Sequence, residues 1–145
     1  MDALDREIIG VVLSDGRATY AKIGGIVGLS VAATKRRLDR LVATGVIRGF
    51  TANVDPAVLG WKIEAYVQTY THGIVPYEEM RRGLEPIPEV VEAATVAGSA
   101  DALLHVVASD MAHLERAISR IRAVDRIERT DAIMVLSRLI NRPMI

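Results

Sequence analysis

The 145-residue chain is half hydrophobic and one quarter charged, its formal net charge is zero, and it contains no cysteine. One ordinary domain or two small ones can form a packed core, whereas disulfides, thiolate metal sites and cysteine nucleophiles are excluded. No apolar run approaches the roughly 20 residues of a membrane span. The acidic start MDALDREIIG lacks the positive segment of a signal peptide, so we expect a cytoplasmic protein.

The charges are distributed unevenly, although their sum is zero. Residues 1–55 hold eight Lys or Arg against six acids, and four of those bases fall between Lys35 and Arg40. A nucleic acid would therefore have to be attracted by a local basic patch and not by the bulk charge of the chain.

Up to Gly45 the apolar residues recur with helical spacing. The first predicted helix has its apolar stripe at Leu4, Ile8 and Val12. Thr19 and Ser30 can each cap a following helix, and Gly28 belongs to the short turn between these two helices. The third helix has a predicted buried stripe at Thr34, Leu38, Leu41 and Val42. Gly45 stands where a helix C-terminus favours a left-handed residue. This order of elements is that of a helix-turn-helix.

From Val46 the pattern changes to extended segments. Residues 61–70 alternate most clearly and predict a strand, Pro76 opens a short helix, and Asp110 can cap another. Further strands are predicted at Val90–Val96, Ala102–Ala108 and Ile127–Leu139. The order β-α-β-β-α-β is the ferredoxin-like arrangement, so the predicted fold class is α+β. We divide the chain into a helix-turn-helix domain (1–48), a linker strand and hinge (49–60), and a second domain (61–145).

The third predicted helix is the candidate DNA-reading element, because a single acid, Asp39, stands among four bases on its exposed side. Ser30 and the first backbone N–H groups can bind a phosphate, and small residues let the helix end approach base edges. Lys35 and Arg36 can read guanine or hold phosphates. Arg37 and Arg40 fit either phosphate contact or internal pairing. The candidate DNA-binding residues are Ser30, Val31, Ala32, Lys35, Arg36, Arg37 and Arg40. The alternative is a solvated charged face without a DNA partner.

An ordered set of short motifs resembles the Lrp/AsnC family of feast/famine regulators. The motifs are Leu4-Asp5, Asp15-Gly16-Arg17, Gly28-Leu29-Ser30, Arg37-Leu38, Leu41, Gly45-Val46-Ile47, Asp55-Pro56, Gly98-x-x-Asp101, Thr130 and Val135-Leu136. Together they cover nearly the whole chain. The resemblance implies a winged helix-turn-helix that binds double-stranded DNA and a C-terminal sensor (RAM) domain. It also implies dimers that often assemble into octamers or larger rings, with amino-acid effectors bound between RAM domains.

The resemblance places the effector site at the turn from Gly98 to Asp101. Gly98 can take a positive φ, and backbone N–H groups in such a turn can hold a carboxylate, although a plain hairpin turn has the same pattern. The implied effector residues are Gly98, Ser99, Ala100, Asp101, Ala102, Thr130 and Ala132. The family usually has a large residue, often tyrosine, on both sides of Asp101, and tends to have threonine at position 132. The three alanines predict either a wider pocket, which prefers large apolar amino acids, or an altered or lost response.

No other pattern indicates catalysis or metal binding. The three histidines, His72, His105 and His113, are scattered without metal-ligand spacing, and Ser99 has no paired base in a nucleophile motif. We therefore expect a protein that is not an enzyme and that uses no cofactor or metal. Two other functions stay open: an architectural DNA-wrapping protein that needs no ligand, and a stand-alone metabolite-binding module.

Overall fold

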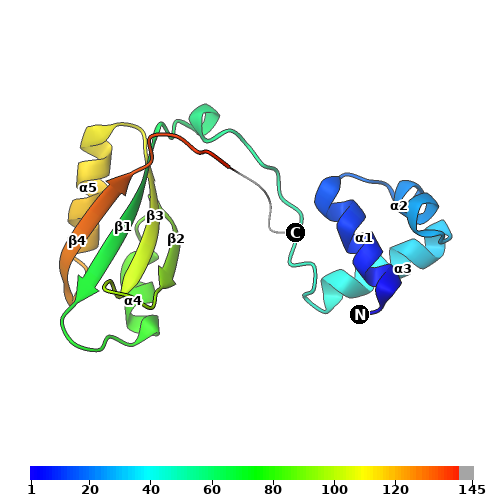
Figure 1. The fold of residues 1–145 in the computed structure, drawn as a ribbon, viewed down its shortest axis with the longest axis horizontal. Coiled ribbons are helices and arrows are strands. Elements are labelled where there is room, and N and C mark those ends of the chain that lie inside the picture. Colours follow the sequence, from blue (N-terminus) through cyan, green and yellow to red (C-terminus); the bar gives the residue numbers. More distant parts are fainter. Residues whose placement is uncertain (141–145) are drawn as a thin grey trace. The chain divides into compact units, whose positions relative to one another are not determined.

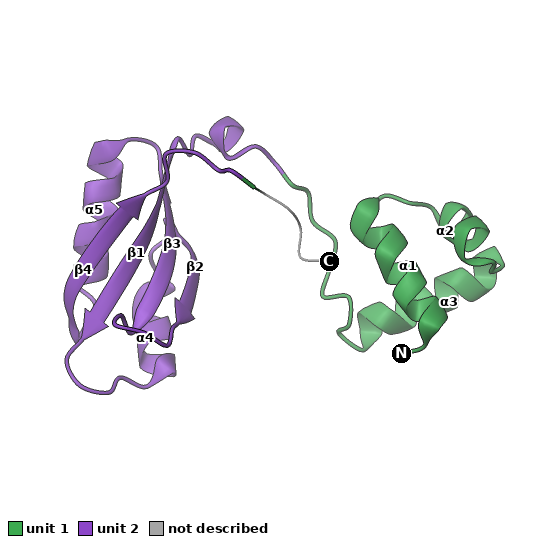
Figure 2. Cartoon of the chain, in the orientation of Figure 1, with its two compact units in different colours: residues 1–53, 140–145 green, residues 54–139 purple. Residues whose placement is uncertain are grey.

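The three predicted N-terminal helices all form, and capping side chains fix where they begin. The computed structural model describes residues 1–140, which divide into two units: an N-terminal unit (residues 1–53, to which residue 140 is also assigned) and a C-terminal unit (residues 54–139) (Figure 2). The N-terminal unit contains α1 (Ala3–Ser14), α2 (Tyr20–Val27) and α3 (Val31–Ala43) (Figure 1). The side chains of Thr19 and Ser30 accept backbone hydrogen bonds from Lys22 and Ala33, which confirms both predicted caps.

The core of the N-terminal unit lies between the three helices. Its buried side chains are Ile8, Ile23, Val27, Leu38 and Leu41. The predicted stripe of α3 is correct at Thr34, Leu38 and Leu41 but wrong at Val42, which is 42 % exposed because α1 and α2 cover only the side that carries the other three. Gly24 permits the close approach of α2 to the start of α3, since a Cβ there would lie 2.5 Å from the carbonyl oxygen of Leu29.

The linker strand expected within residues 49–60 is not formed. Residues 48–55 carry no regular secondary structure, and a short 3₁₀ helix, η1 (Pro56–Leu59), precedes the second unit. A strand needs a neighbour for its backbone N–H and C=O groups, and within residues 1–140 no strand lies beside this segment. For the same reason, the described part of the N-terminal unit is a three-helix structure without the strands of a wing.

The C-terminal unit has the predicted β-α-β-β-α-β order. Its elements are β1 (Ile63–Thr71), α4 (Tyr77–Leu84), β2 (Val90–Thr95), β3 (Ala102–Ala108), α5 (Met111–Arg122) and β4 (Ile127–Met134). The four strands form an antiparallel sheet in the order β2-β3-β1-β4. Figure 1 shows α4 and α5 on the same face of this sheet. The α+β prediction is therefore confirmed.

The strand boundaries differ from the predicted ones at the end of the chain. The last strand was expected to reach Leu139 but ends at Met134, which pairs with Ala65 near the beginning of β1. Only two residues of β1 lie beyond this pair. The last hydrogen bond between the two segments runs from Val135 N to the Glu64 carbonyl oxygen, at 2.9 Å. β4 therefore ends because β1 offers no further backbone partner.

The helix-covered face of the sheet holds the core of the C-terminal unit, and the opposite face is open within the described chain. Ala65, Val67 and Leu104 are fully buried under the helices. Strand alternation turns Tyr66 and its register partners His105 and Ile133 to the opposite face. Ile133 is 54 % exposed there, so this open face presents apolar and aromatic groups to a possible partner.

Candidate DNA-reading helix and effector turn

The outer face of α3 is exposed, as its helical period predicts. Val31, Ala32, Lys35 and Arg36 lie on this face. Arg40 is exposed as well, but its guanidinium group pairs with Asp5 of α1. Lys35 Nζ lies 2.5 Å from an oxygen of Asp39, one turn further along the helix. This hydrogen bond raises the pKa of Lys35. Asp39, the single acid among the bases, is therefore paired with Lys35. Lys35 is one of the two side chains predicted to read guanine.

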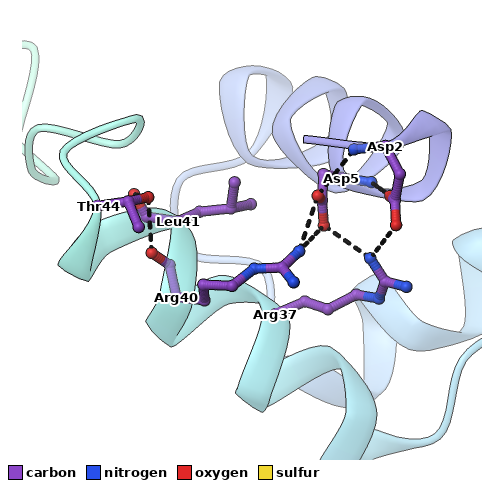
Figure 3. A network of polar contacts seen from close by, with 6 residues as sticks. All are labelled: Asp2, Asp5, Arg37, Arg40, Leu41 and Thr44. Carbon is purple, nitrogen blue, oxygen red and sulfur yellow. Dashed lines mark hydrogen bonds and ion pairs between the residues drawn. The ribbon is translucent and has the colours of Figure 1, made fainter.

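The inner side of α3 is held to α1 by a network of ion pairs (Figure 3). The carboxylate of Asp5 is almost completely buried, and it lies 2.8 Å from both Arg37 Nη1 and Arg40 Nη2. Arg37 also contacts Asp2, 2.7 Å away. The helix end continues the network, since the Thr44 hydroxyl donates to the Arg40 carbonyl at 2.8 Å. Of the two roles that the sequence left open for Arg37 and Arg40, the geometry shows internal pairing.

The electrostatics of Asp5 show how firmly this network is held. Asp5 and Asp2 form a reciprocal capping box, in which each carboxylate accepts the other residue's backbone N–H. The hydrogen bond from Asp2 N, together with Arg37 and Arg40, lowers the pKa of Asp5 from its ordinary 3.8 to about 2. Asp5 thus stays charged at neutral pH, and it links α1 to Arg37 and Arg40 of α3.

Sequence reasoning named Asp5 only as part of the Leu4-Asp5 motif, without a structural role, and did not single out Asp2. A signal was present, because Asp5 lies one helical turn before Ile8, on the side of α1 that its apolar residues bury. An acid on the buried side of a helix needs a cationic partner. Four basic residues are grouped on α3, so the sequence could have indicated that this helix provides the partner of Asp5. It could not have indicated which of the arginines form the pair.

The predicted effector turn is built differently from the expectation. Gly98 is not among the glycines with positive φ, so the turn does not use the positive φ that a glycine can take there. Ala100 and Ala102 are buried instead of lining an open turn, 5 % and 2 % exposed. Asp101 holds the end of β1, because its Oδ2 accepts hydrogen bonds from Thr71 N at 2.7 Å and from Thr71 Oγ1 at 3.1 Å. The turn is therefore fastened to its own sheet.

The sheet brings some of the predicted effector residues together. Thr69 pairs with Ala102 on one side and with Thr130 on the other, which places these three residues in one row of the helix-covered face. Thr130 is buried, and its hydroxyl accepts a hydrogen bond from Arg122 Nε at 2.7 Å. Ala132 lies two residues further along β4 and is exposed. Ser99 is exposed in the turn itself.

A groove runs beside this row, between α4 and strands β2 and β3. Its volume is about 370 Å³, and its lining is mainly apolar: Tyr77, Met80, Arg81, Leu84, Ala93, Ala94, Thr95 and Ala102. Ala102 is the one predicted effector residue in its wall, and Arg81 is the one charged side chain there. A large side chain at position 102 would take up part of this space, so the alanine leaves the groove open.

Each histidine lies beside a glutamate and not in a metal site. His72, His105 and His113 approach Glu128, Glu64 and Glu89 at 2.9, 2.5 and 2.6 Å. Burial by itself would raise the pKa of Glu89. The hydrogen bonds from His113 and Arg120 contribute to a larger opposite effect, so the pKa of Glu89 is lowered. Within residues 1–140, no three His, Cys, Asp or Glu side chains come together to hold a metal ion. Every helix in this range is too short or too polar to cross a bilayer.

Comparison with known proteins assigns the two units. Residues 1–42 match the family described as AsnC-type helix-turn-helix domain, and residues 64–145 match the Lrp/AsnC ligand binding domain. The chain belongs to the Lrp/AsnC family. The HTH-type transcriptional regulator Rv2324 of Mycobacterium tuberculosis is 49 % identical over 142 residues, which cover 98 % of this chain and 96 % of that protein. The family resemblance predicted from the motifs is thus confirmed.

Solved structures of Lrp/AsnC proteins agree with the fold. The feast or famine regulatory protein Rv3291c from M. tuberculosis, solved with L-methionine, is 30 % identical, with a TM-score of 0.92 over 99 % of this chain and 97 % of that one. Escherichia coli AsnC is 26 % identical, with a TM-score of 0.90 over 99 % and 97 %. The chain is therefore a transcriptional regulator of the Lrp/AsnC type, with its helix-turn-helix in α1–α3.

Proposed function

We propose that this regulator reads its operator with the exposed face of α3, assembles through the open face of its sheet, and responds to a large apolar amino acid. It would act in the cytoplasm on double-stranded DNA, without enzymatic activity or a cofactor. The observation that carries the DNA-reading role is the division of α3 into two sides. One side is fixed to α1 by Asp5, and the other presents Lys35 and Arg36 to solvent.

The DNA-reading role is tested with Arg36→Ala in the full-length protein. Duplexes are first selected by the wild type from a random-sequence library, and their affinity is measured over a range of salt concentrations. We expect Arg36→Ala to weaken binding by about 10- to 100-fold if the guanidinium reads a base. Arg116→Ala, at an exposed arginine of α5, is the matched control and binds like wild type. Equal affinities for wild type and Arg36→Ala would contradict the docking.

The groove beside Ala102 supports an effector with a large apolar side chain. It is lined mainly by apolar groups, and its one charged side chain, Arg81, already pairs with Glu78 and Glu85. A similar regulator, Rv3291c, was solved with L-methionine. Calorimetry should show tighter binding of Leu, Phe or Met than of Asn, Gly or Ser. Tighter binding of the small polar amino acids would contradict the proposal, and binding of none of them would favour an architectural, ligand-free role.

The open face of the sheet supports self-association. Tyr66, Leu103 and Ile133 lie there, Tyr66 stacks on His105 with ring centroids 5.1 Å apart, and Arg129 lies over the Tyr70 ring. A dimer also places two reading helices about one DNA turn apart. We propose at least a dimer, with octamers or larger rings as further assembly.

The assembly is tested with two matched isoleucines. Ile133 lies on the open face at 54 % exposure, and Ile74 lies in the loop after β1 at 95 % exposure. Light scattering of Ile133→Lys should show a shift toward a monomer near 16 kDa, whereas Ile74→Lys keeps the wild-type mass. A monomeric wild type at micromolar concentration would rule out the assembly.

A further inference from the structure

The N-terminal residue of the reading helix is an exposed valine. Val31 begins α3 and is 53 % exposed, and its neighbour Ala32 is exposed as well. The core of the N-terminal unit is formed by other residues and does not include Val31. A β-branched apolar residue gains little from helix propensity and nothing from exposure to water. Val31 is therefore available for contact with a partner outside the chain.

The polar groups around Val31 are already in use. Ser30 Oγ accepts the backbone N–H of Ala33 at 3.2 Å, and Thr34 Oγ1 donates to the Ser30 carbonyl at 3.0 Å from a buried position. Lys35 is paired with Asp39. The first turn of α3 thus presents methyl groups to the outside, and its side chains there have little capacity to recognise a base by hydrogen bonds.

Only one base offers an apolar group at the matching place. The first residues of a recognition helix contact base edges in the major groove, and the thymine C5-methyl is the apolar group exposed on those edges. We propose that Val31 is a specificity-determining residue that selects thymine in each half-site through its C5-methyl group. This inference rests on the proposed role of α3 as the DNA-reading helix.

The test removes one methyl group at a time from the DNA. In the duplex that wild type selects from a random-sequence library, each thymine is replaced in turn by deoxyuridine, which keeps the base pairing and removes only the C5-methyl. We expect one thymine in each half-site to matter, with affinity falling about fourfold per half-site on its replacement, the equivalent of one buried CH₂ group. The other thymines should tolerate the change.

Val31→Ala closes a double-mutant cycle with this DNA change. The variant should bind the thymine and deoxyuridine duplexes equally, because the methyl no longer has a partner. Val42→Ala is the matched control: Val42 is a second exposed valine of α3, 42 % exposed, near the opposite end of the helix. It should keep the full thymine preference. Circular dichroism confirms that both variants fold, which is expected because alanine favours helix over valine.

The outcomes separate this inference from the proposed function. If a duplex is selected but no thymine shows methyl dependence, or if Val31→Ala keeps the wild-type preference for thymine over deoxyuridine, the assignment of Val31 is overturned while DNA reading stands. If Val42→Ala loses the preference as well, the effect is not specific to Val31 and the assignment fails. If no duplex is enriched at all, both the DNA-reading role and the assignment fail.

Discussion

Helix α3 and the turn before β3 hold their candidate functional residues in opposite ways. In α3 the fixing contacts are on one side, through Asp5, Arg37 and Arg40, so the other side is left exposed on a rigid support. In the turn before β3, Asp101 is itself one of the fixing contacts, because it holds Thr71. The difference shows that a residue in a family motif can hold together the local structure around it.

The largest effect expected from this comparison is that of Asp5→Ala. The substitution removes the shared acceptor of Arg37 and Arg40 from a buried position, which is far more disruptive than loss of a surface pair. Hydrogen exchange of the full-length protein should show protection in α1 and α3 falling by roughly tenfold or more. Asp39→Ala, which breaks the exposed pair with Lys35, should leave that protection unchanged. Similar losses in both variants would show that the network does not support α3.

Two substitutions of Asp101 separate support from ligand contact. Asp101→Asn keeps a carbonyl oxygen that can accept from Thr71 N and Oγ1, whereas Asp101→Ala keeps neither acceptor nor charge. If the carboxylate binds the ammonium of the effector, Asp101→Asn retains the wild-type melting temperature and loses at least about tenfold in amino-acid affinity. If Asp101 only supports the turn, Asp101→Asn binds like wild type and Asp101→Ala alone is weakened and destabilised.

The groove is tested by filling it from the edge strand. Ala93 lies in the groove wall on β2 and is exposed, so Ala93→Leu adds volume without overpacking the buried core. Calorimetry should show weaker binding of Phe and Leu by about tenfold, because the added side chain competes for the same space. Ala112→Leu, at an exposed alanine of α5, is the control with unchanged binding. Unchanged affinity in Ala93→Leu would place the effector elsewhere.

The smallest effect is the acid dependence of the N-terminal unit. The pKa of Asp5 is lowered in the folded chain to about 2, so the carboxylate favours the folded state above its ordinary value of 3.8. This contribution is lost progressively as the pH falls from about 4 to about 2. Hydrogen exchange in residues 1–53 should therefore show protection that decreases over this window, with a weaker dependence in Asp5→Asn. An identical dependence in the variant would contradict the role of Asp5.

Sequence predicted the helical region more closely than the effector region. The caps Thr19 and Ser30 and the buried Leu38 and Leu41 follow from local hydrogen bonding and from a 3.6-residue period, which act over short distances in the chain. The pairing of Asp5 with Arg37 and Arg40 was missed because these partners are 32 and 35 residues away. Pairing over such distances in the sequence depends on how α1 packs against α3, and this packing cannot be predicted from the local sequence pattern.

In the C-terminal unit, the order of elements was predictable but the direction of single side chains was not. Alternation identified β1, yet the burial of Ala102 and the hydroxyl contact of Thr130 with Arg122 depend on which face the helices cover. The end of β4 depends on where its neighbour begins, and Ala65 lies more than 60 residues from Met134 in the sequence. Sheet partners of this kind are set by tertiary structure.

The chain enters and leaves the sheet of the C-terminal unit at neighbouring positions, since Ala65 pairs with Met134 and Val135 N bonds to the Glu64 carbonyl. The beginning of β1 and the end of β4 are thus neighbours in the sheet, and the rest of the chain is attached to the unit at this one edge. We therefore expect exchange or removal of the N-terminal unit to leave the β1–β4 ladder intact. By the same logic, a circular permutant with a short peptide joining these ends and new termini in an exposed loop keeps the sheet intact.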